Sequence, residues 1–276
     1  MKTVKSKINI QGNGLMTNLA ADVEICPNLL QEKQGIRFFI NGKMIEAKTS
    51  NVVSCEHCVV LANVEEGANA KIALVEHFMA ACAICGIDNL DVHFKSDGFE
   101  IPILDGSAKV WVEKFAEAGF VGDEAEVKPL NQTFSFVHNN SLIVMTPQEA
   151  PTTITYAVNF NHPELKNRWV TLEQDKNLEE IIEARTFGYL KDLETFQKMG
   201  YSKGVTIDNT VGLTEDGYTT QLRSEFEPVK HKILDIIGDL YLTGVNPLKL
   251  NANIMVKEAG HALHVQFAKN IEKNLI

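Results

Sequence analysis

The chain is short of positive charge and of long apolar runs. Its 276 residues include 26 Lys and Arg against 36 Asp and Glu, a formal net charge of −10. This deficit disfavours a nucleic-acid-binding surface, although it leaves room for a local basic pocket that holds a phosphorylated ligand. No apolar run approaches the roughly 20 residues of a membrane-spanning helix, and no hydrophobic region follows Met1–Lys5, so no signal peptide is predicted. We therefore expect a cytoplasmic protein.

Cysteine is also scarce, with 5 residues, and thiols stay reduced in the cytoplasm. Four of them form two C-x-x-C pairs, Cys55 with Cys58 and Cys82 with Cys85. Such pairs resemble a structural four-cysteine zinc site, but they are also typical of small buried residues. Four-cysteine zinc sites usually stabilise small domains, whereas a chain of this length can bury a large hydrophobic core without a metal. The second interpretation is therefore favoured, with a structural zinc site as the alternative.

What remains is the composition of an ordinary globular protein, with 45% hydrophobic and 22% charged residues. The length suits one large domain or two of moderate size. Alternating apolar residues predict strands in the first part, and an Ala-rich apolar stretch ended by Gly86 predicts a helix. In chain order, the expected elements are strands at 5–11, 20–25 and 36–40, a helix at 70–85, a strand at 90–94 and a helix at 108–118.

The second part repeats this plan after a polar stretch at 122–129, which is the best candidate for a linker. Its expected elements are strands at 133–137, 142–145 and 152–160, short helices at 177–183 and 191–199, a mixed segment at 200–219 with a short strand, a helix at 229–241, a strand at 252–256 and a closing segment at 264–274. Both parts have hairpin strands, then a long helix with histidine, then a strand. This pattern predicts an α+β fold of two similar halves, 1–122 and 130–276, rather than a doubly wound sheet.

The helix expected at 229–241 carries His231, Asp235 and Asp239 at intervals of four residues, so all three lie near one edge. An imidazole and a carboxylate at this spacing can bind one divalent ion without any movement of the backbone. The alternative is an ordinary surface pair, since such pairs are common on amphipathic helices. Taken alone, the helix leaves both interpretations open.

Two other histidines have neighbours suited to catalysis. Glu76 and His77 lie within an apolar helix, where a carboxylate and an imidazole are costly unless they are paired or bind a ligand. His261 follows Gly260 in a turn, which is one way to present an imidazole to a cleft. A helix edge and a plain turn are the alternatives. The remaining histidines have no partner at an informative spacing and are expected at the surface or in packing: His57, His93, His138, His162 and His264.

Together these residues suit metal-assisted hydrolysis. Two histidines and one carboxylate leave a fourth zinc position open, as in catalytic zinc sites. A nearby glutamate can take a proton from water, and a separate acid can protonate a leaving amine. The set therefore predicts hydrolysis of an amide or an ester.

Several stretches occur in the order and at the distances found in one known family: VEHFMAA, GIDNLDVHF, EIPILDGSA, ARTFGYLKDLE, VKHKILDIIGDLYLTG and AGHAL. From about Val4 to Ala268 the chain resembles the UDP-3-O-acyl-N-acetylglucosamine deacetylases, the zinc enzymes that commit the lipid A pathway. The resemblance implies two α+β halves with the site between them, and an insert near 187–207 that holds the substrate's acyl chain. It also implies that the N-acetyl group of a UDP-linked, acylated amino sugar is hydrolysed to acetate.

The resemblance further implies a role for each matching residue. The positions that match the family's zinc ligands are His77, His231 and Asp235, with iron as an alternative metal. The positions that match the acid–base groups are Glu76 as the general base, His261 as the general acid and Asp239 as the carboxylate that orients His261. The positions that match the substrate contacts are Thr186 at the oxyanion, Phe187 and Lys232. A monomer is expected.

The sequence departs from the family's pattern in a few places. An early Gly-x-Gly-Leu-His-Thr-Gly has Met16 and Asn18 in place of its histidine and last glycine, and a Gly-Gly-Ser-like stretch becomes 203–206, with Val205. A few extra residues lie near 218–221. These positions fall where the substrate's nucleotide, sugar or acyl groups would be held, so a paralogue that acts on a different N-acetylated sugar is one alternative. A non-catalytic relative that keeps the fold is the other, and the presence of all the catalytic positions weakens it.

Overall fold

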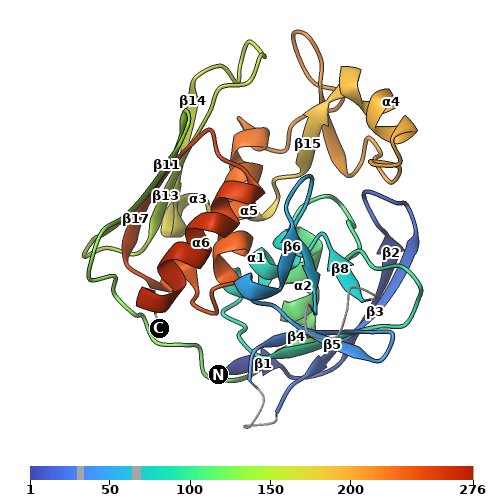
Figure 1. Ribbon diagram of the computed structural model, residues 1–276, viewed down its shortest axis with the longest axis vertical. Helices are drawn as coiled ribbons and strands as arrows, with labels where there is room; N and C mark the ends of the chain where they lie inside the picture. The colour runs from blue at the N-terminus through green and yellow to red at the C-terminus, as the bar shows by residue number, and fades with distance from the viewer. Residues whose placement is uncertain (30–33, 64–69, 276) are drawn as a thin grey trace.

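The computed structural model describes residues 1–29, 34–63 and 70–275 (Figure 1). Two five-stranded sheets dominate it. The first has the strand order β2 (Ile8–Asn13), β3 (Ala20–Pro27), β9 (Leu90–Phe94), β4 (Ile36–Ile40) and β5 (Lys43–Glu46). The second has the order β11 (Phe134–His138), β12 (Ser141–Pro147), β17 (Ala252–Lys257), β13 (Thr153–Val158) and β14 (Arg168–Glu173). The α+β class is confirmed.

The two sheets share one plan of strand directions. In each, the last strand in the sequence lies in the centre, where it pairs in parallel with one neighbour: β9 with β4, and β17 with β13. The other pairs within both sheets are antiparallel. A common strand order with matching directions supports the internal repeat read from the sequence. The division at 122–130 stays a prediction.

Six helices accompany the sheets in the described part of the chain: α1 (Glu76–Ile84), α2 (Lys109–Ala118), α3 (Gln174–Ile182), α4 (Leu190–Lys198), α5 (Glu227–Tyr241) and α6 (His261–Leu275). In Figure 1, α1, α5 and α6 lie between the second sheet on the left and the first sheet at the lower right. Nearly every residue of α1 and α5 is buried. Helices buried on all sides form the core of a larger protein, so any polar group on α1 or α5 is enclosed there.

The helix predicted at 70–85 is wrong in its first part. Residues Lys71–Ala73 form strand β8, which pairs with β7 (Val60–Ala62), and β7 pairs with β6 (Val52–Ser54). Leu74 has a φ of 64°, which ends the extended backbone just before α1 begins at Glu76. The error arises because a short run of buried apolar residues looks alike in a strand and in a helix.

Several other elements differ from those expected. His261 begins helix α6 and does not lie in a free turn. The sequence pattern predicts neither strand β14 nor strand β15 (Thr186–Tyr189). In the structure, β15 pairs in parallel with β16 (Thr210–Leu213). With α4, these two strands form the lobe at the upper right of Figure 1. A further antiparallel pair, β1 (Lys2–Val4) with β10 (Phe120–Gly122), ties the first strand to the end of α2.

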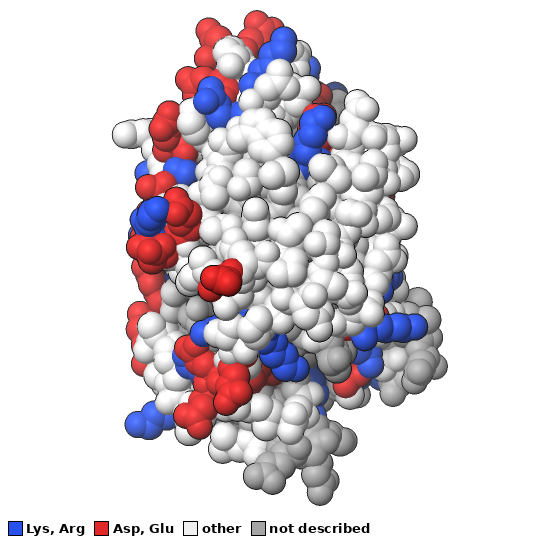
Figure 2. All heavy atoms as spheres, turned by 90° about the vertical axis from the view of Figure 1, so that its left-hand side faces the viewer, with Lys and Arg blue, Asp and Glu red and all other residues white. Residues whose placement is uncertain are grey.

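The outer face of the second sheet has few charged side chains, as the broad white area of Figure 2 shows. Across its middle, Val144, Met255, Thr155 and Thr171 stand side by side on adjacent strands. Such β-branched and apolar residues suit a pleated, half-exposed surface. Helices α1 and α5 instead carry a set of buried titratable groups: Glu76, His77, His231, Asp235 and Asp239. In the described segments, no helix combines the length and hydrophobicity needed to cross a membrane.

Candidate active site

Helices α1 and α5 cross in close contact at the centre of the molecule. Gly238 of α5 makes this approach tolerable, because a Cβ at this position would lie 2.0 Å from the carbonyl oxygen of Glu76. The crossing brings Glu76 and His77 of α1 against the polar edge of α5. Segments far apart in the sequence thereby supply one cluster of buried titratable groups.

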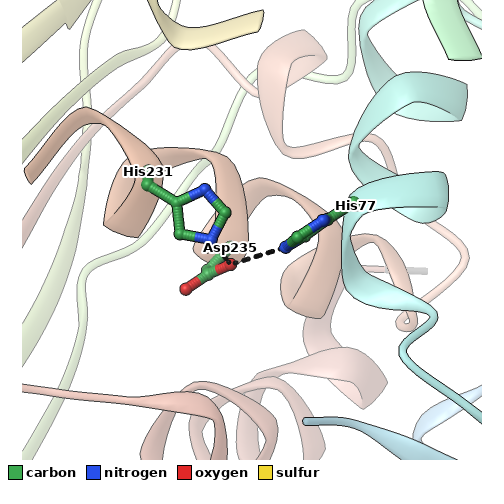
Figure 3. A group of neighbouring side chains, drawn as sticks. All are labelled: His77, His231 and Asp235. Atoms are coloured by element: carbon green, nitrogen blue, oxygen red, sulfur yellow. Dashed lines mark ion pairs between the residues drawn. The ribbon is translucent and has the colours of Figure 1, made fainter. Parts of the chain in front are cut away.

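His77, His231 and Asp235 form a group whose ligand atoms all lie within 4.8 Å of one another. The Asp235 Oδ1 atom is 3.7 Å from His77 Nε2 and 3.3 Å from His231 Nε2. Figure 3 shows both imidazoles directed at this carboxylate, His77 from α1 and the other two residues from α5. All three side chains are buried, so the alternative of a surface His–Asp pair on α5 is excluded.

The protonation of this group suits metal binding. The Nδ1 atom of His231 lies 2.9 Å from the carbonyl oxygen of Ala184, so Nδ1 carries the proton and Nε2 keeps its lone pair. Burial, reinforced by the nearby His231, lowers the pKa of His77 to about 3. Burial opposes ionisation of Asp235, but the nearby positive charge, first that of Lys232, holds its pKa well below the ordinary value. Two neutral imidazoles and one carboxylate result.

The same residues meet the geometric requirement for a metal ion. Ligand atoms of a tetrahedral zinc ion lie about 3.3 Å apart, because each bond is about 2.0–2.1 Å long. The two separations from Asp235 Oδ1, 3.3 and 3.7 Å, are close to this value, and all three ligand atoms lie within 4.8 Å of one another. Moreover, Asp235 Oδ1 is buried without a hydrogen-bond partner among the described residues. A cation held between the three side chains would supply that partner.

Glu76 and His261 face each other next to this group. One carboxylate oxygen of Glu76 accepts a hydrogen bond from the Val59 backbone nitrogen at 3.0 Å, and the other lies 3.7 Å from His261 Nε2. Burial raises the pKa of Glu76 to about 7, against the opposing charge of His261. His261 Nε2 also lies 3.8 Å from Asp235 Oδ2. The predicted base and the predicted acid therefore both border the candidate metal ligands.

His261 is held by Asp239, as the four-residue spacing on α5 allows. The Nδ1 atom of His261 lies 2.7 Å from Asp239 Oδ2, which directs Nε2 toward Glu76 and Asp235. Burial alone would lower the pKa of His261, but the surrounding carboxylates, first among them Asp239, raise it to about 9. At neutral pH the imidazole therefore keeps the proton on Nε2.

The prediction for His264 needs correction, because this residue belongs to the cluster. It is fully buried, and its Nδ1 atom lies 2.8 Å from the same Asp239 oxygen that His261 contacts. A spacing of three residues places His261 and His264 on one face of α6. The sequence does not reveal this spacing as helical, because Gly260 favours a turn at His261, whereas the structure begins helix α6 there.

A cleft of about 440 Å³ opens beside the cluster, and both halves of the chain line it. The predicted substrate contacts Thr186, Phe187 and Lys232 all face this cleft. The backbone nitrogen of Thr186 donates to the Gly106 carbonyl oxygen at 2.8 Å, which ties β15 to a turn of the first half. The Lys232 ammonium donates to Asp235 Oδ2 at 2.5 Å, so it directly contacts one of the candidate metal ligands.

The segment predicted to hold an acyl chain contributes much of the apolar lining. The residues of 187–207 that face the cleft include Leu190, Leu193, Phe196 and Val205. Met199, which belongs to the same segment, does not line the cleft and is 63% exposed beyond the end of α4. Leu15 and Leu74 of the first half also line the cleft. The cleft is thus apolar along one part and charged at the cluster.

Two of the sequence departures meet in the wall of the cleft. Met16 and Val205 both line it, and the loops that carry them are joined by backbone hydrogen bonds, from Lys203 nitrogen to Met16 oxygen and from Gly204 nitrogen to Leu15 oxygen. The buried carboxylate of Glu100 accepts hydrogen bonds from the backbone nitrogens of Met16 and Thr17. The unusual residues therefore lie on a fixed surface beside the site.

The cysteines do not assemble into a metal site. Within the described ranges, no group of three or more close ligand atoms includes a cysteine. Burial raises the pKa of Cys55 to about 12 and that of Cys85 to about 11, and it raises the pKa values of Cys58 and Cys82 as well. Thiols that stay protonated are poor metal ligands, so the interpretation as small buried residues is favoured.

Comparison with known proteins agrees with this geometry. A sequence model of the UDP-3-O-acyl N-acetylglycosamine deacetylases matches residues 1–273. The UDP-3-O-acyl-N-acetylglucosamine deacetylase of Leptospira biflexa is 34% identical over 278 residues, which cover 98% of this chain and 89% of that protein. The enzyme of the same name from Nostoc sp. is 34% identical over 283 residues, which cover 98% of this chain and 97% of that protein. The chain therefore belongs to the UDP-3-O-acyl N-acetylglycosamine deacetylase family.

Proposed function

We propose that this protein hydrolyses the N-acetyl group of UDP-3-O-acyl-N-acetylglucosamine and releases acetate, the committed step of lipid A biosynthesis. The observation that carries the proposal is the buried cluster in which Glu76 and His261 border the group of His77, His231 and Asp235. An apolar cleft beside the cluster suits an acylated substrate. Membership of a family of deacetylases supports the same reaction.

His77, His231 and Asp235 would hold one divalent ion, and zinc suits two imidazoles and a carboxylate. When bound, such an ion acts as a Lewis acid toward the acetyl carbonyl and promotes ionisation of water. Ferrous iron accepts the same ligands, so the native metal depends on supply as well as on the site. The identity of the metal is part of the proposal.

Side chains of the protein carry out the proton transfers of the proposed reaction. In the proposed reaction Glu76 takes a proton from the attacking water, and Nε2 of His261 gives its proton to the departing amine. Asp239 holds the opposite side of that imidazole at 2.7 Å. The hydroxyl group of Thr186 donates to the oxygen on which negative charge develops. Water first adds to the acyl carbon, which places the negative charge on that oxygen. The C–N bond then breaks as the amine receives its proton, leaving acetate and a free amine.

The remaining cleft residues would bind the substrate. Lys232 supplies positive charge next to the reacting group, and Phe187 packs against His231 with ring centroids 6.1 Å apart. The apolar residues of 187–207 would take the fatty chain. Because the cytoplasm supplies nucleotide sugars, we place the enzyme there, and we propose that it works as a monomer.

Direct assay decides between this substrate and the alternative of another N-acetylated sugar, which Met16 in the cleft wall favours. The purified chain should release acetate from UDP-3-O-acyl-N-acetylglucosamine much faster than from the same nucleotide sugar without the acyl chain. No release from the acylated substrate at high enzyme concentration would contradict the proposal. Activity on another N-acetylated sugar would then identify a paralogue, and no activity on any would indicate a non-catalytic relative.

Metal analysis tests the ligand set separately. We expect one metal ion per chain, lost in His231→Ala and Asp235→Ala but kept in Cys55→Ser and Cys82→Ser. The two serine variants are matched controls, since each changes a metal-binding residue type without touching the cluster. Loss of metal in the serine variants alone would assign the ion to the cysteines and overturn the ligand set.

A further inference from the structure

Among the residues that the structure describes, the carboxylate of Asp239 forms hydrogen bonds through only one of its oxygens. Oδ2 lies 2.7 Å from His261 Nδ1 and 2.8 Å from His264 Nδ1. The other oxygen, Oδ1, is buried and has no hydrogen-bond partner in the part of the chain that the structure describes. A carboxylate that is held through only one oxygen can rotate about its Cβ–Cγ bond. The orientation of the Asp239 carboxylate therefore depends on both imidazoles. His261 is thus only one of two groups that position Asp239.

A second hydrogen bond holds the other nitrogen of the His264 ring, Nε2. Its Nε2 atom lies 2.9 Å from the hydroxyl oxygen of Tyr156, which projects from β13 of the second sheet. That hydroxyl also lies 2.8 Å from the carbonyl oxygen of Ala259, two residues before α6. Both His264 and Tyr156 are 0% exposed. The contacts link the sheet, helix α6 and helix α5 in one buried chain of hydrogen bonds.

The donors in this chain can be assigned. His264 Nδ1 faces a carboxylate oxygen, which only accepts, so Nδ1 carries a proton. Burial lowers the pKa of His264 despite the neighbouring Asp239, so the ring is neutral and Nε2 is an acceptor. The single proton of the Tyr156 hydroxyl is therefore shared between Nε2 and the Ala259 carbonyl oxygen. The order is therefore Tyr156 to His264, His264 to Asp239, and His261 to Asp239 from the other side.

We propose that His264 and Tyr156 are positioning residues for the deacetylation, which hold Asp239 so that it keeps His261 aimed at the cleft. The inference rests on the proposed role of His261 as the acid. Neither residue lines the cleft, so both act through Asp239. A purely structural histidine would fill the same space, but it would not need a donor directed at the carboxylate that holds the acid.

Three variants separate the hydrogen bond from the packing. His264→Leu keeps most of the volume but removes the donor, whereas His264→Asn retains an N–H close to the position of Nδ1. Tyr156→Phe removes only the hydroxyl group. Tyr241→Phe is the matched control, because the buried Tyr241 hydroxyl donates to the Ile87 carbonyl oxygen at 2.8 Å and has no hydrogen bond to a histidine among the described residues.

Turnover of the metal-loaded enzymes gives the main readout. We expect His264→Leu to lower kcat by roughly 10- to 100-fold, the usual effect of removing a group that orients an active-site side chain. KM and metal content should stay near the wild-type values. His264→Asn should recover most of kcat, Tyr156→Phe should show a smaller loss, and Tyr241→Phe should leave kcat unchanged.

Proton NMR of the imidazole N–H groups gives a second readout that does not depend on activity. We expect two strongly hydrogen-bonded Nδ1 protons at low field in the wild type, from His261 and His264. His264→Asn should lose the second resonance and keep the first, whereas His264→Leu should also shift the first. An unshifted His261 resonance in His264→Leu would overturn the inference.

The outcomes distinguish this inference from the proposed function. Wild-type kcat in a folded His264→Leu enzyme, or equal losses in His264→Leu and His264→Asn, would show that the donor does not matter. If the leucine variant fails to fold, an unchanged kcat in Tyr156→Phe together with an unchanged NMR spectrum would overturn it as well. If the wild type releases no acetate, the proposed function fails, and the NMR readout alone decides whether His264 positions Asp239.

Discussion

Glu76 and His261 lie 3.7 Å apart, and burial and neighbouring charge give them the proton affinities that the proposed base and acid need. Burial raises the pKa of the Glu76 carboxyl to about 7, so it can exchange a proton near neutrality. The carboxylates around His261 outweigh its burial and raise its pKa to about 9, so the imidazole holds a proton to donate. A pair of buried groups with separate proton affinities is typical of acid–base catalysis.

The role proposed for His261 can be tested by truncation. We expect His261→Ala to lower kcat by roughly 10²- to 10⁴-fold, because the departing amine then lacks a positioned acid. The metal content should not change, since the ligand group lies on α1 and α5. Steady-state kinetics with metal analysis would check this, with His138→Ala on the exposed end of β11 as the control. Full activity in His261→Ala would remove this residue from the mechanism.

At the scale of elements, the α1–α5 crossing decides whether the cluster exists. The carbonyl oxygen of Glu76 occupies the space that a Cβ on Gly238 would need. A side chain there must push the helices apart, and with them His77 and His231. The glycine is required by this close approach and not by backbone conformation.

We therefore expect Gly238→Ala to lower the free energy of unfolding by about 1–3 kcal/mol, the usual cost of overpacking a core, and to weaken metal binding. Urea unfolding and metal titration would measure both effects. Gly217→Ala is a suitable control, because the nearest atom to its new Cβ would be Thr214 Oγ1 at an ordinary 3.7 Å. Equal stability of Gly238→Ala and the wild type would contradict the close contact described here.

A buried ion pair joins the start of α5 to the segment before β15. The carboxylate of Glu227 accepts from the backbone nitrogen and Nε of Arg185, at 2.9 and 2.8 Å. Burial opposes ionisation of Glu227, but the hydrogen bonds and charge of Arg185 outweigh it and lower the pKa below its ordinary 4.5. The pair thereby sets the position of Ala184, whose carbonyl oxygen contacts His231.

This pair predicts a dependence of stability on pH. A carboxyl group whose pKa is lowered in the folded state stabilises the protein above its ordinary pKa, and the contribution is lost as the pH falls through the folded value. The wild type should therefore exceed Glu227→Gln in free energy of unfolding at neutral pH, and the difference should shrink as the pH falls below about 4.5. Denaturant unfolding across this range would test it. A difference that grows on acidification would contradict the assigned shift.

At the scale of the whole molecule, two sheets with one strand order enclose the helices that carry the cluster. The first half contributes Leu15 and Leu74 to the cleft, and the second contributes Phe187, Leu193 and Phe196. Neither half provides the cleft or the three candidate metal ligands alone. The site is therefore a property of the packed pair.

An apolar cleft of this kind predicts a dependence on the length of the acyl chain. Burying one CH₂ group is worth about 0.8 kcal/mol, so each CH₂ removed from the substrate should lower kcat/KM by up to about fourfold. Phe196→Ala should flatten this dependence, whereas Met199→Ala, on an exposed residue outside the cleft, should not. A series of substrates with shortened chains would measure it. The absence of any dependence would place the acyl chain elsewhere.

The sequence alone determined those parts of the site that depend on neighbours along the chain. The four-residue spacing of His231, Asp235 and Asp239 is meaningful because a helix places such residues on one edge whatever surrounds it. The hairpins and the repeated order of elements were also readable, since turn residues and alternating apolar residues act locally. Names and roles for the residues required resemblance to a family in addition.

Only the tertiary structure decided which distant segments meet. Three features depend on packing between separate elements. They are the crossing at Gly238, the strand formed by Lys71–Ala73, and the two hydrogen bonds by which His261 and His264 contact Asp239. Periodicity reports which face of an element is buried, but not which residue it is buried against. His264 therefore read as an ordinary packing residue until the fold placed it 2.8 Å from Asp239.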